Sequence, residues 1–174
     1  SEKLQEDLNS LHGWTEKWQL QFNKKKCKVL HIGPKNQQYT YSITDPTKAP
    51  SILEASSYEK DLGVCMDDQL VFDEHITQIT AKANRIAGLI FRTFREPDKN
   101  TFVPLYKSQV RPILEYCSSV WSPHLIRQKI QIEKVQRRAT KRVEGLKDKP
   151  YQERLRILGL PTLEYRRIRQ DMVM

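Results

Sequence analysis

The strongest chemical signal in the sequence is a cluster of basic side chains between residues 127 and 142. Seven Lys or Arg residues fall in this segment against one carboxylate, that of Glu133. Spacings of three, one and three residues place several of them along one side of a helix, beside an apolar stripe. Such a row binds nucleic-acid phosphates and gives affinity without sequence specificity. The candidate nucleic-acid-binding residues are Lys134, Arg137, Arg138, Lys141 and Arg142, with Arg166, Arg167 and Arg169 as a weaker second group.

The charge is distributed unevenly along the chain. Residues 1–75 hold nine Lys or Arg and twelve Asp or Glu, net −3, whereas residues 76–174 hold twenty-one and nine, net +12. The positive surplus of the C-terminal part favours a polyanion partner, above all a nucleic acid. A solvated basic surface without a ligand stays open as the alternative, because runs of like charge are common on protein surfaces.

Other residue patterns offer little catalytic chemistry. Asp67 and Asp68 imitate the metal-binding hairpin of a polymerase, but two-metal phosphoryl transfer needs a further carboxylate on a neighbouring strand. No suitable strand precedes them in the sequence, so we interpret the pair as a solvated turn. The four histidines lack metal-ligand spacing. For Trp14, Trp18 and Trp121 we expect packing in the core rather than stacking on bases.

Composition indicates a folded protein from a reducing compartment. Its three cysteines are widely spaced and suit neither a disulfide framework nor a metal knuckle, so we expect an intracellular location, in the nucleus, the cytoplasm or both. No apolar run reaches the ~20 residues that a membrane span needs, and we expect no membrane partner. The chain opens at Ser1 in helix-like sequence and reads as a piece of a longer protein.

The spacing of apolar residues predicts the elements that must position these side chains. Before residue 70 it predicts a helix over about 2–18 and short strands near 27–32, 39–43 and 62–66. After residue 70 it predicts helices over about 73–96, 102–121, 126–144 and 151–158, and another from 162 onward. Asp73 is expected to cap the first of these, and Pro112 to kink the second. We therefore predict an α+β fold: residues 1–70 form a helix with a small antiparallel sheet, and residues 71–174 form a mainly α-helical bundle.

Several strings of residues follow one another in a characteristic order. They are LQEDLN at residues 4–9, KCKVLHIG at 26–33, LGV at 62–64, LYKS at 105–108, VRPILEY at 110–116, VWSP at 120–123, VQRRATK at 135–141 and LPTLEYRR at 160–167. Together, over nearly the whole chain, they resemble the carboxyl-terminal half of a reverse transcriptase from a non-LTR retrotransposon of the LINE type, jockey-like branch.

The resemblance implies that residues 1–70 are the last helix and strands of a polymerase palm and that residues 71–174 are its thumb. Lys26 would lie near the triphosphate as an auxiliary residue, and Leu62, Gly63 and Val64 would form the primer grip. In this family an Asp-bearing strand and a Tyr-x-Asp-Asp hairpin hold the Mg²⁺ ions of the polymerase, and neither motif occurs here. The resemblance therefore implies that this chain binds no cofactor of its own and is inactive as a polymerase by itself.

The implied partners are an RNA template, an RNA–DNA heteroduplex and the rest of the polymerase chain. Two alternatives stay open. A truncated copy of such an element could be expressed by a host as a non-catalytic RNA-binding or protein-interaction module. The chain could also be a decayed remnant with no function.

Overall fold

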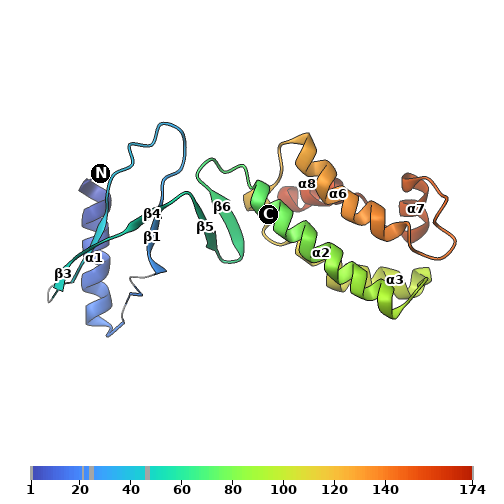
Figure 1. The fold of residues 1–174 in the computed structure, drawn as a ribbon, viewed down its shortest axis with the longest axis horizontal. Helices are drawn as coiled ribbons and strands as arrows, with labels where there is room; N and C mark the ends of the chain where they lie inside the picture. The colour runs from blue at the N-terminus through green and yellow to red at the C-terminus, as the bar shows by residue number, and fades with distance from the viewer. Residues whose placement is uncertain (1, 21, 24–25, 46–47, 174) are drawn as a thin grey trace. The chain divides into compact units, whose positions relative to one another are not determined.

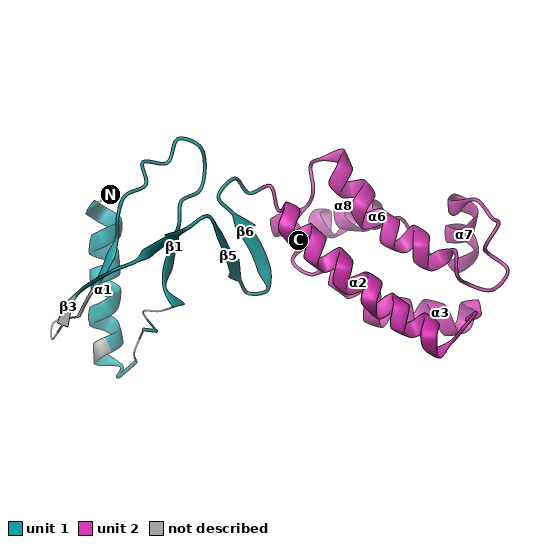
Figure 2. Ribbon diagram, viewed as in Figure 1, with its two compact units in different colours: residues 1–70 teal, residues 71–174 magenta. Residues whose placement is uncertain are grey.

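The computed structural model describes residues 2–20, 22–23, 26–45 and 48–173, and it divides the chain into two compact units, residues 1–70 and 71–174 (Figure 2). Among the described residues, unit 1 carries the strands and one helix, and unit 2 is helical (Figure 1). Helices and small sheets thus occur together in the chain, which confirms the predicted α+β class.

Unit 1 consists of one helix, α1 (Glu2–Lys17), and short strands joined in three pairs. The strands are β1 (Lys28–Leu30), β2 (Ser42–Asp45), β3 (Lys48–Ile52), β4 (Glu54–Ser56), β5 (Tyr58–Asp61) and β6 (Val64–Asp67). The pairs β2–β3 and β5–β6 are antiparallel, but β1 pairs with β4 in parallel. The predicted single antiparallel sheet is therefore wrong. Residues 31–53 connect β1 to β4, and a connection of this length can return the chain in the same direction.

The β5–β6 hairpin turns through Leu62 and Gly63, between the paired residues Asp61 and Val64. Both turn residues have positive φ, 45° at Leu62 and 89° at Gly63. This is the arrangement of a type I′ turn, whose twist suits a hairpin. Glycine adopts it freely because it has no Cβ, whereas leucine is strained there. The segment 62–66, predicted as a strand, is thus a turn followed by the beginning of β6.

The tryptophans do not share one environment. Trp121 is 1% exposed, as core packing predicts. Trp14 and Trp18, whose ring centroids lie 6.1 Å apart, are 51% and 60% exposed. Core packing is therefore the wrong prediction for this pair. Leu4 and Leu11 on the same stripe of α1 are also exposed, so this helix presents an uncovered apolar face within unit 1.

Unit 2 is a bundle of helices. They are α2 (Asp73–Thr93), α3 (Lys99–Leu105), the π-helical turn η2 (Tyr106–Val110), α4 (Arg111–Glu115), α5 (Ser118–Trp121), α6 (Ile126–Thr140), α7 (Tyr151–Leu158) and α8 (Leu163–Val173). α7 has the predicted range, whereas α6 ends before the predicted residue 144. The predicted cap at Asp73 is wrong. Phe72, with φ of 61°, takes the N-cap position, and the Asp73 carboxylate accepts a hydrogen bond from Gln128 instead.

The segment predicted as one helix over 102–121 is broken. Pro112 has no N–H to donate, and the Arg111 N–H donates to the Tyr106 carbonyl oxygen, five residues back, which makes the π-helical turn. α4 then ends at Glu115, and Cys117, with φ of 51°, precedes α5. The kink predicted at Pro112 is thus a change of helix type followed by a break.

α2 and α6 lie side by side and run in the same direction (Figure 1). Their contacts keep a constant offset of 54 residues: Arg127 pairs with Asp73, Gln131 donates to Thr77 Oγ1 at 3.3 Å, and Arg138 donates to Asn84 Oδ1 at 3.3 Å. Apolar residues lie behind this polar seam in the core. Ile76, Ala83 and Ile132 are each 0% exposed.

Four helices of unit 2 surround the core in the order α2, α6, α8, α4. α2 packs against α6 and against α4, and α6 packs against α8. Arg166 on α8 joins Glu115 at the end of α4 and closes the ring. The α2–α6 seam and the α4–α8 seam therefore lie on opposite sides of the bundle.

Candidate nucleic-acid interface

α6 places the predicted basic row on the surface. Its apolar stripe is buried, with Ile132 at 0% and Val135 and Ala139 at 2% exposure, which turns the opposite side of the helix to solvent. The row itself consists of Lys134, Arg137, Arg138, Lys141 and Arg142, all exposed. Lys141 and Arg142 follow the end of the helix rather than lying within it. Within the part of the chain that the structure describes, none of the five forms an ion pair, so their charges are not neutralised by the protein.

Neutral groups position three of these guanidinium groups. Arg137 lies over the Tyr151 ring at 4.7 Å from its centroid, and Arg142 lies over the Phe91 ring at 4.2 Å. Arg138 donates to the Asn84 side chain. An aromatic face or an amide oxygen holds an arginine without cancelling its charge. The row is therefore partly preorganised and still positive.

A buried hydrogen-bond network holds α6 in place. The Gln136 Oε1 accepts from the Tyr106 hydroxyl at 2.7 Å, and its Nε2 donates to the Tyr151 hydroxyl and the Pro161 carbonyl, each at 3.0 Å. The Glu133 carboxylate accepts from the Tyr151 hydroxyl and from the Leu163 N–H. Burial raises the pKa of Tyr106 and of Tyr151, and the hydrogen bond to Glu133 adds to the rise at Tyr151. The network joins α6 to η2, α7 and the start of α8.

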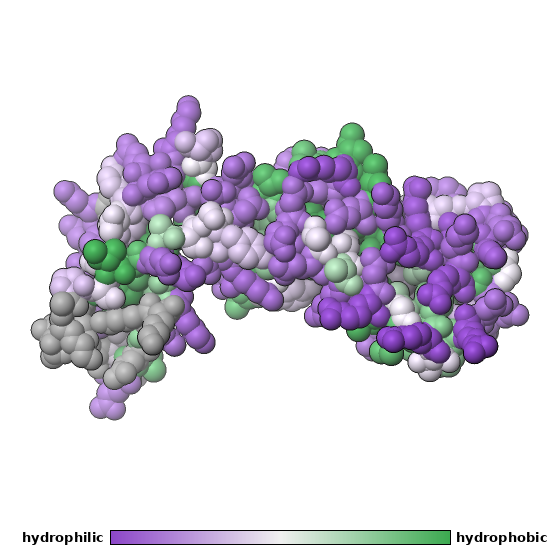
Figure 3. Space-filling model, in the orientation of Figure 1, coloured by the Kyte–Doolittle hydropathy of each residue, from purple (hydrophilic) through white to green (hydrophobic). Residues whose placement is uncertain are grey.

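A groove of about 550 Å³ runs beside the row, between α6 and α7. Lys134 and Arg137 line one wall, and Ile130 and Tyr151 supply apolar surface. Figure 3 shows hydrophilic side chains over most of the viewed face of unit 2, with an apolar patch near the beginning of α6. Ile126 and Ile130, in the first turns of α6, are 75% and 49% exposed.

The sequence analysis missed two basic residues of this surface. Arg85 and Arg92 are exposed on α2, and neither forms an ion pair with another described residue. They are seven residues apart, two turns of one helix side, and Arg85 adjoins Asn84, which contacts Arg138. Only the pairing of α2 with α6 brings them to the same surface as the row. Their own spacing was the signal, but it does not name the neighbouring helix.

The second predicted basic group lies elsewhere, and part of that prediction is wrong. Arg167 is 2% exposed, and its Nη1 and Nη2 have no hydrogen-bond partner among the described residues. Burial lowers the pKa of its guanidinium. A buried side chain cannot contact a nucleic acid, so the prediction for Arg167 is corrected. Arg166 pairs with Glu115 on the α4–α8 side, away from the α6 row, and Arg169 is exposed on the same helix.

The residues mapped onto the palm lie in unit 1. Lys26 is exposed in a single turn before β1, where its N–H donates to the Asn23 carbonyl at 2.8 Å. Its neighbours in the run of three lysines, residues 24 and 25, lie outside the described residues. Of the predicted primer grip, Leu62 is 82% exposed and Gly63 is exposed beside it, but Val64 is 4% exposed and packs inward. The tip of the hairpin is thus the accessible part of that motif.

The structure gives Asp67 a local role. Its Oδ1 accepts from the Gln69 N–H at 3.1 Å, and the Asp68 carbonyl accepts from the Gly33 N–H at 2.8 Å. Over the described ranges, no three His, Cys, Asp or Glu side chains gather in a way that could hold a metal ion. Over the same ranges, no helix has the length and apolar character needed to span a membrane.

Comparison with known proteins gives no further identification. No protein-family model matches the chain, and no curated protein or solved structure matches it either.

Proposed function

We propose that the chain is the carboxyl-terminal part of an RNA-directed DNA polymerase of the non-LTR retrotransposon kind, and that unit 2 acts as its thumb and grips the RNA–DNA template–primer. The observation that carries the proposal is the exposed row on α6, whose five basic side chains have no acidic partner in the described chain. Arg85 and Arg92 on α2 widen the same surface. Intracellular action, in the nucleus or the cytoplasm, is part of this proposal.

The row suits a phosphate backbone rather than base edges. Lys134 and Lys141 are seven residues apart, which is about 10 Å along a helix. One strand of a duplex carries a charge every ~3.4 Å, so the row faces about three phosphates. Lys and Arg contacts of this kind follow the shape of a heteroduplex and are insensitive to its sequence.

Unit 1 supports the view that the chain works within a larger polymerase. The uncovered apolar face of α1, with Leu4, Trp14 and Trp18, is a surface that further parts of the palm could cover. In this proposal the exposed tip at Leu62 and Gly63 contacts the primer strand, and Lys26 assists near the triphosphate. The described residues offer no carboxylate set that fits the two Mg²⁺ ions of a polymerase. No step of the proposal passes through a metal in this chain.

The test is fluorescence-anisotropy binding of the full chain to a recessed RNA–DNA primer–template across a salt series. The triple variant Arg137→Glu, Arg138→Glu, Lys141→Glu should bind more weakly, and its slope of log affinity against log salt should fall by about 2–3. A matched control, Lys99→Glu, Lys147→Glu, Arg156→Glu, makes the same change of net charge at exposed positions outside the row. The control should keep most of the affinity.

Two outcomes would count against the proposal. Equal losses in both triple variants would show that net charge, not the row, drives binding. Equal binding to the heteroduplex, duplex DNA and single-stranded RNA would leave a generic basic module, which is the host-expressed RNA-binding alternative. Primer extension by this chain alone would overturn the assignment of the catalytic carboxylates to missing segments.

A further inference from the structure

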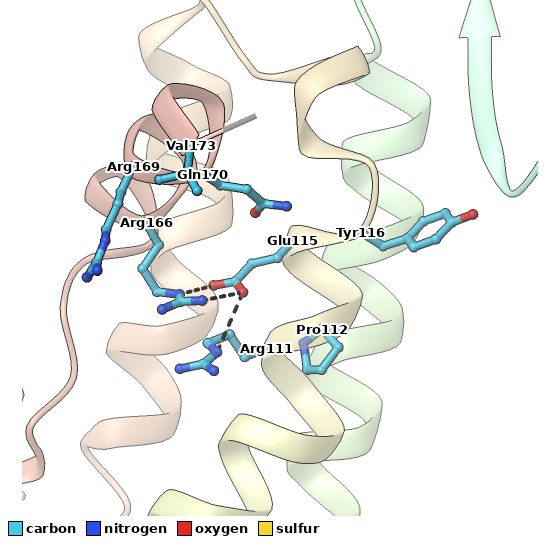
Figure 4. A pocket seen from close by; sticks show the side chains of 8 residues that line it. All are labelled: Arg111, Pro112, Glu115, Tyr116, Arg166, Arg169, Gln170 and Val173. Atoms are coloured by element: carbon cyan, nitrogen blue, oxygen red, sulfur yellow. Dashed lines mark hydrogen bonds and ion pairs between the residues drawn. The ribbon is translucent and has the colours of Figure 1, made fainter.

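A hollow of about 590 Å³ opens on the α4–α8 side of unit 2 (Figure 4). Arg111 and Glu115 reach it from α4, and Arg166 and Arg169 from α8. Pro112 and Val173 add apolar surface. Arginines from two separate helices, 55 residues or more apart in the sequence, thus meet at one place.

The charges of this hollow are not balanced. Glu115, with a side chain 13% exposed, accepts hydrogen bonds from Arg166 Nε and, at 3.0 Å, from Arg166 Nη2. Arg111 Nε lies 3.6 Å from the same carboxylate. Glu115 is the only carboxylate among the described lining residues, and Arg169 forms no ion pair in the described chain. Three guanidinium groups against one carboxylate leave two positive charges.

Glu115 also orients the hollow. Its hydrogen bonds fix the Arg166 guanidinium and raise the pKa of that group. A guanidinium that is already held in place loses little rotamer freedom when its remaining N–H groups bind a ligand. Planar N–H pairs of arginine match the oxygens of a phosphate. The hollow therefore suits a phosphate group better than a neutral ligand.

The hollow and the α6 row face away from each other. In the ring α2, α6, α8, α4, the α4–α8 side is opposite the α2–α6 side, and Figure 4 looks onto the hollow with α2 and α6 behind it. A heteroduplex that lies along α6 leaves the hollow open. Building on the proposed function, we propose that the hollow binds phosphates of a second nucleic-acid segment, so that one copy of unit 2 holds two nucleic acids on opposite sides.

A bridging assay with the full chain tests this. A biotinylated RNA–DNA primer–template is immobilised and saturated with protein, and a fluorescent single-stranded RNA is then added. We expect the wild-type chain to retain the fluorescent RNA on the surface. Arg169→Glu should lower that retention about five-fold or more, because it reverses a phosphate contact, and should leave the affinity for the immobilised duplex within about two-fold.

Controls separate this inference from the proposed function. Arg156→Glu, an equal charge change at an exposed position of α7, should keep both activities. The triple variant of the α6 row should lose capture of the immobilised duplex. If the wild type fails to capture the duplex, the proposed function fails. If it captures the duplex but retains no second nucleic acid, or if Arg169→Glu bridges as well as wild type, only the present inference is overturned.

Two further measurements close other routes. Analytical ultracentrifugation should find one protein with two nucleic acids, and a complex that needs two protein copies would contradict a two-sided monomer. A polyglutamate peptide should compete weakly for the second site. If it displaces the fluorescent RNA as well as unlabelled RNA does, the hollow recognises acidic peptides and the nucleic-acid assignment is overturned. Circular dichroism confirms that Arg169→Glu is folded, as expected for an exposed position.

Discussion

Arg167 carries a charge into the interior of unit 2. Its side chain is 2% exposed, and its two terminal nitrogens have no hydrogen-bond partner among the described residues. Nearby carboxylates, Glu133 first among them, favour the charged form, but burial is the larger influence and lowers the pKa. A buried guanidinium of this kind lowers stability relative to an apolar residue of similar volume.

We therefore predict that Arg167→Met leaves the free energy of unfolding unchanged or raises it by about 1–3 kcal/mol. Affinity for the heteroduplex should not change, because residue 167 is inside the bundle. Urea unfolding and the anisotropy assay measure the two quantities. Arg167→Lys keeps the buried charge and should show no gain. A drop in affinity for Arg167→Met without loss of stability would contradict the placement of this side chain.

At the scale of single residues, the sequence predicts position on a helix better than burial. The α6 row was predicted to be exposed and is, because the buried stripe next to it is unambiguous. Arg166 and Arg167 are adjacent, so they point about 100° apart on α8, and spacing alone does not say which one enters the core. Trp14 shows the opposite error. It belongs to an apolar stripe, yet no described part of unit 1 covers that stripe.

Among the elements, α6 depends on the network around Gln136. This amide is 1% exposed and links the hydroxyls of Tyr106 and Tyr151 to the Pro161 carbonyl. A buried donor that loses its acceptor costs far more than an exposed hydrogen bond. The network therefore fixes the angle at which α6 presents its basic row.

Gln136→Leu should lower the free energy of unfolding by about 2 kcal/mol, because it leaves the Tyr106 hydroxyl buried without an acceptor. Gln152→Leu, the same change at an exposed position of α7, should cost less than ~0.5 kcal/mol. Adding Tyr106→Phe to Gln136→Leu should recover part of the loss, since both partners are then apolar. Urea unfolding monitored by far-ultraviolet circular dichroism measures all three. A fully additive double variant would refute the coupling.

Local signals explain which elements the sequence predicts. α7 has the predicted range because Pro150 precedes it and Gly159, with φ of 63°, ends it. The break after Glu115 has no such marker beyond Pro112, and the periodicity of apolar residues continues across it. The parallel pairing of β1 with β4 joins segments 26 residues apart and depends on contacts that no local pattern encodes.

For the whole molecule, the two buried tyrosines make stability depend on alkaline pH. Tyr106 and Tyr151 have pKa values above the ordinary value of about 10 in the folded chain, chiefly because of burial. The unfolded chain ionises both tyrosines near pH 10, and the folded chain does not. Their contribution is thus complete below pH ~10 and is lost progressively as pH rises toward the folded values.

We expect the free energy of unfolding to fall between pH 10 and 11 more steeply than between pH 8 and 9. Urea titrations at each pH measure it. The double variant Tyr106→Phe, Tyr151→Phe should be less stable at pH 8 but should lose less between pH 10 and 11, because no buried phenol is left to ionise. A wild-type chain whose stability stays flat to pH 11 would contradict the burial of these hydroxyls.

The constant offset between α2 and α6 also has a consequence for synthesis. Each residue of α2 along the seam must wait for its partner 54 positions later to leave the ribosome. At ~5–20 residues per second, that delay is roughly 3–11 s. During this interval the core side of α2, with Ile76 and Ala83, has no α6 to cover it. A nascent chain stalled before residue 126 should therefore bind chaperones more readily than one released after residue 142.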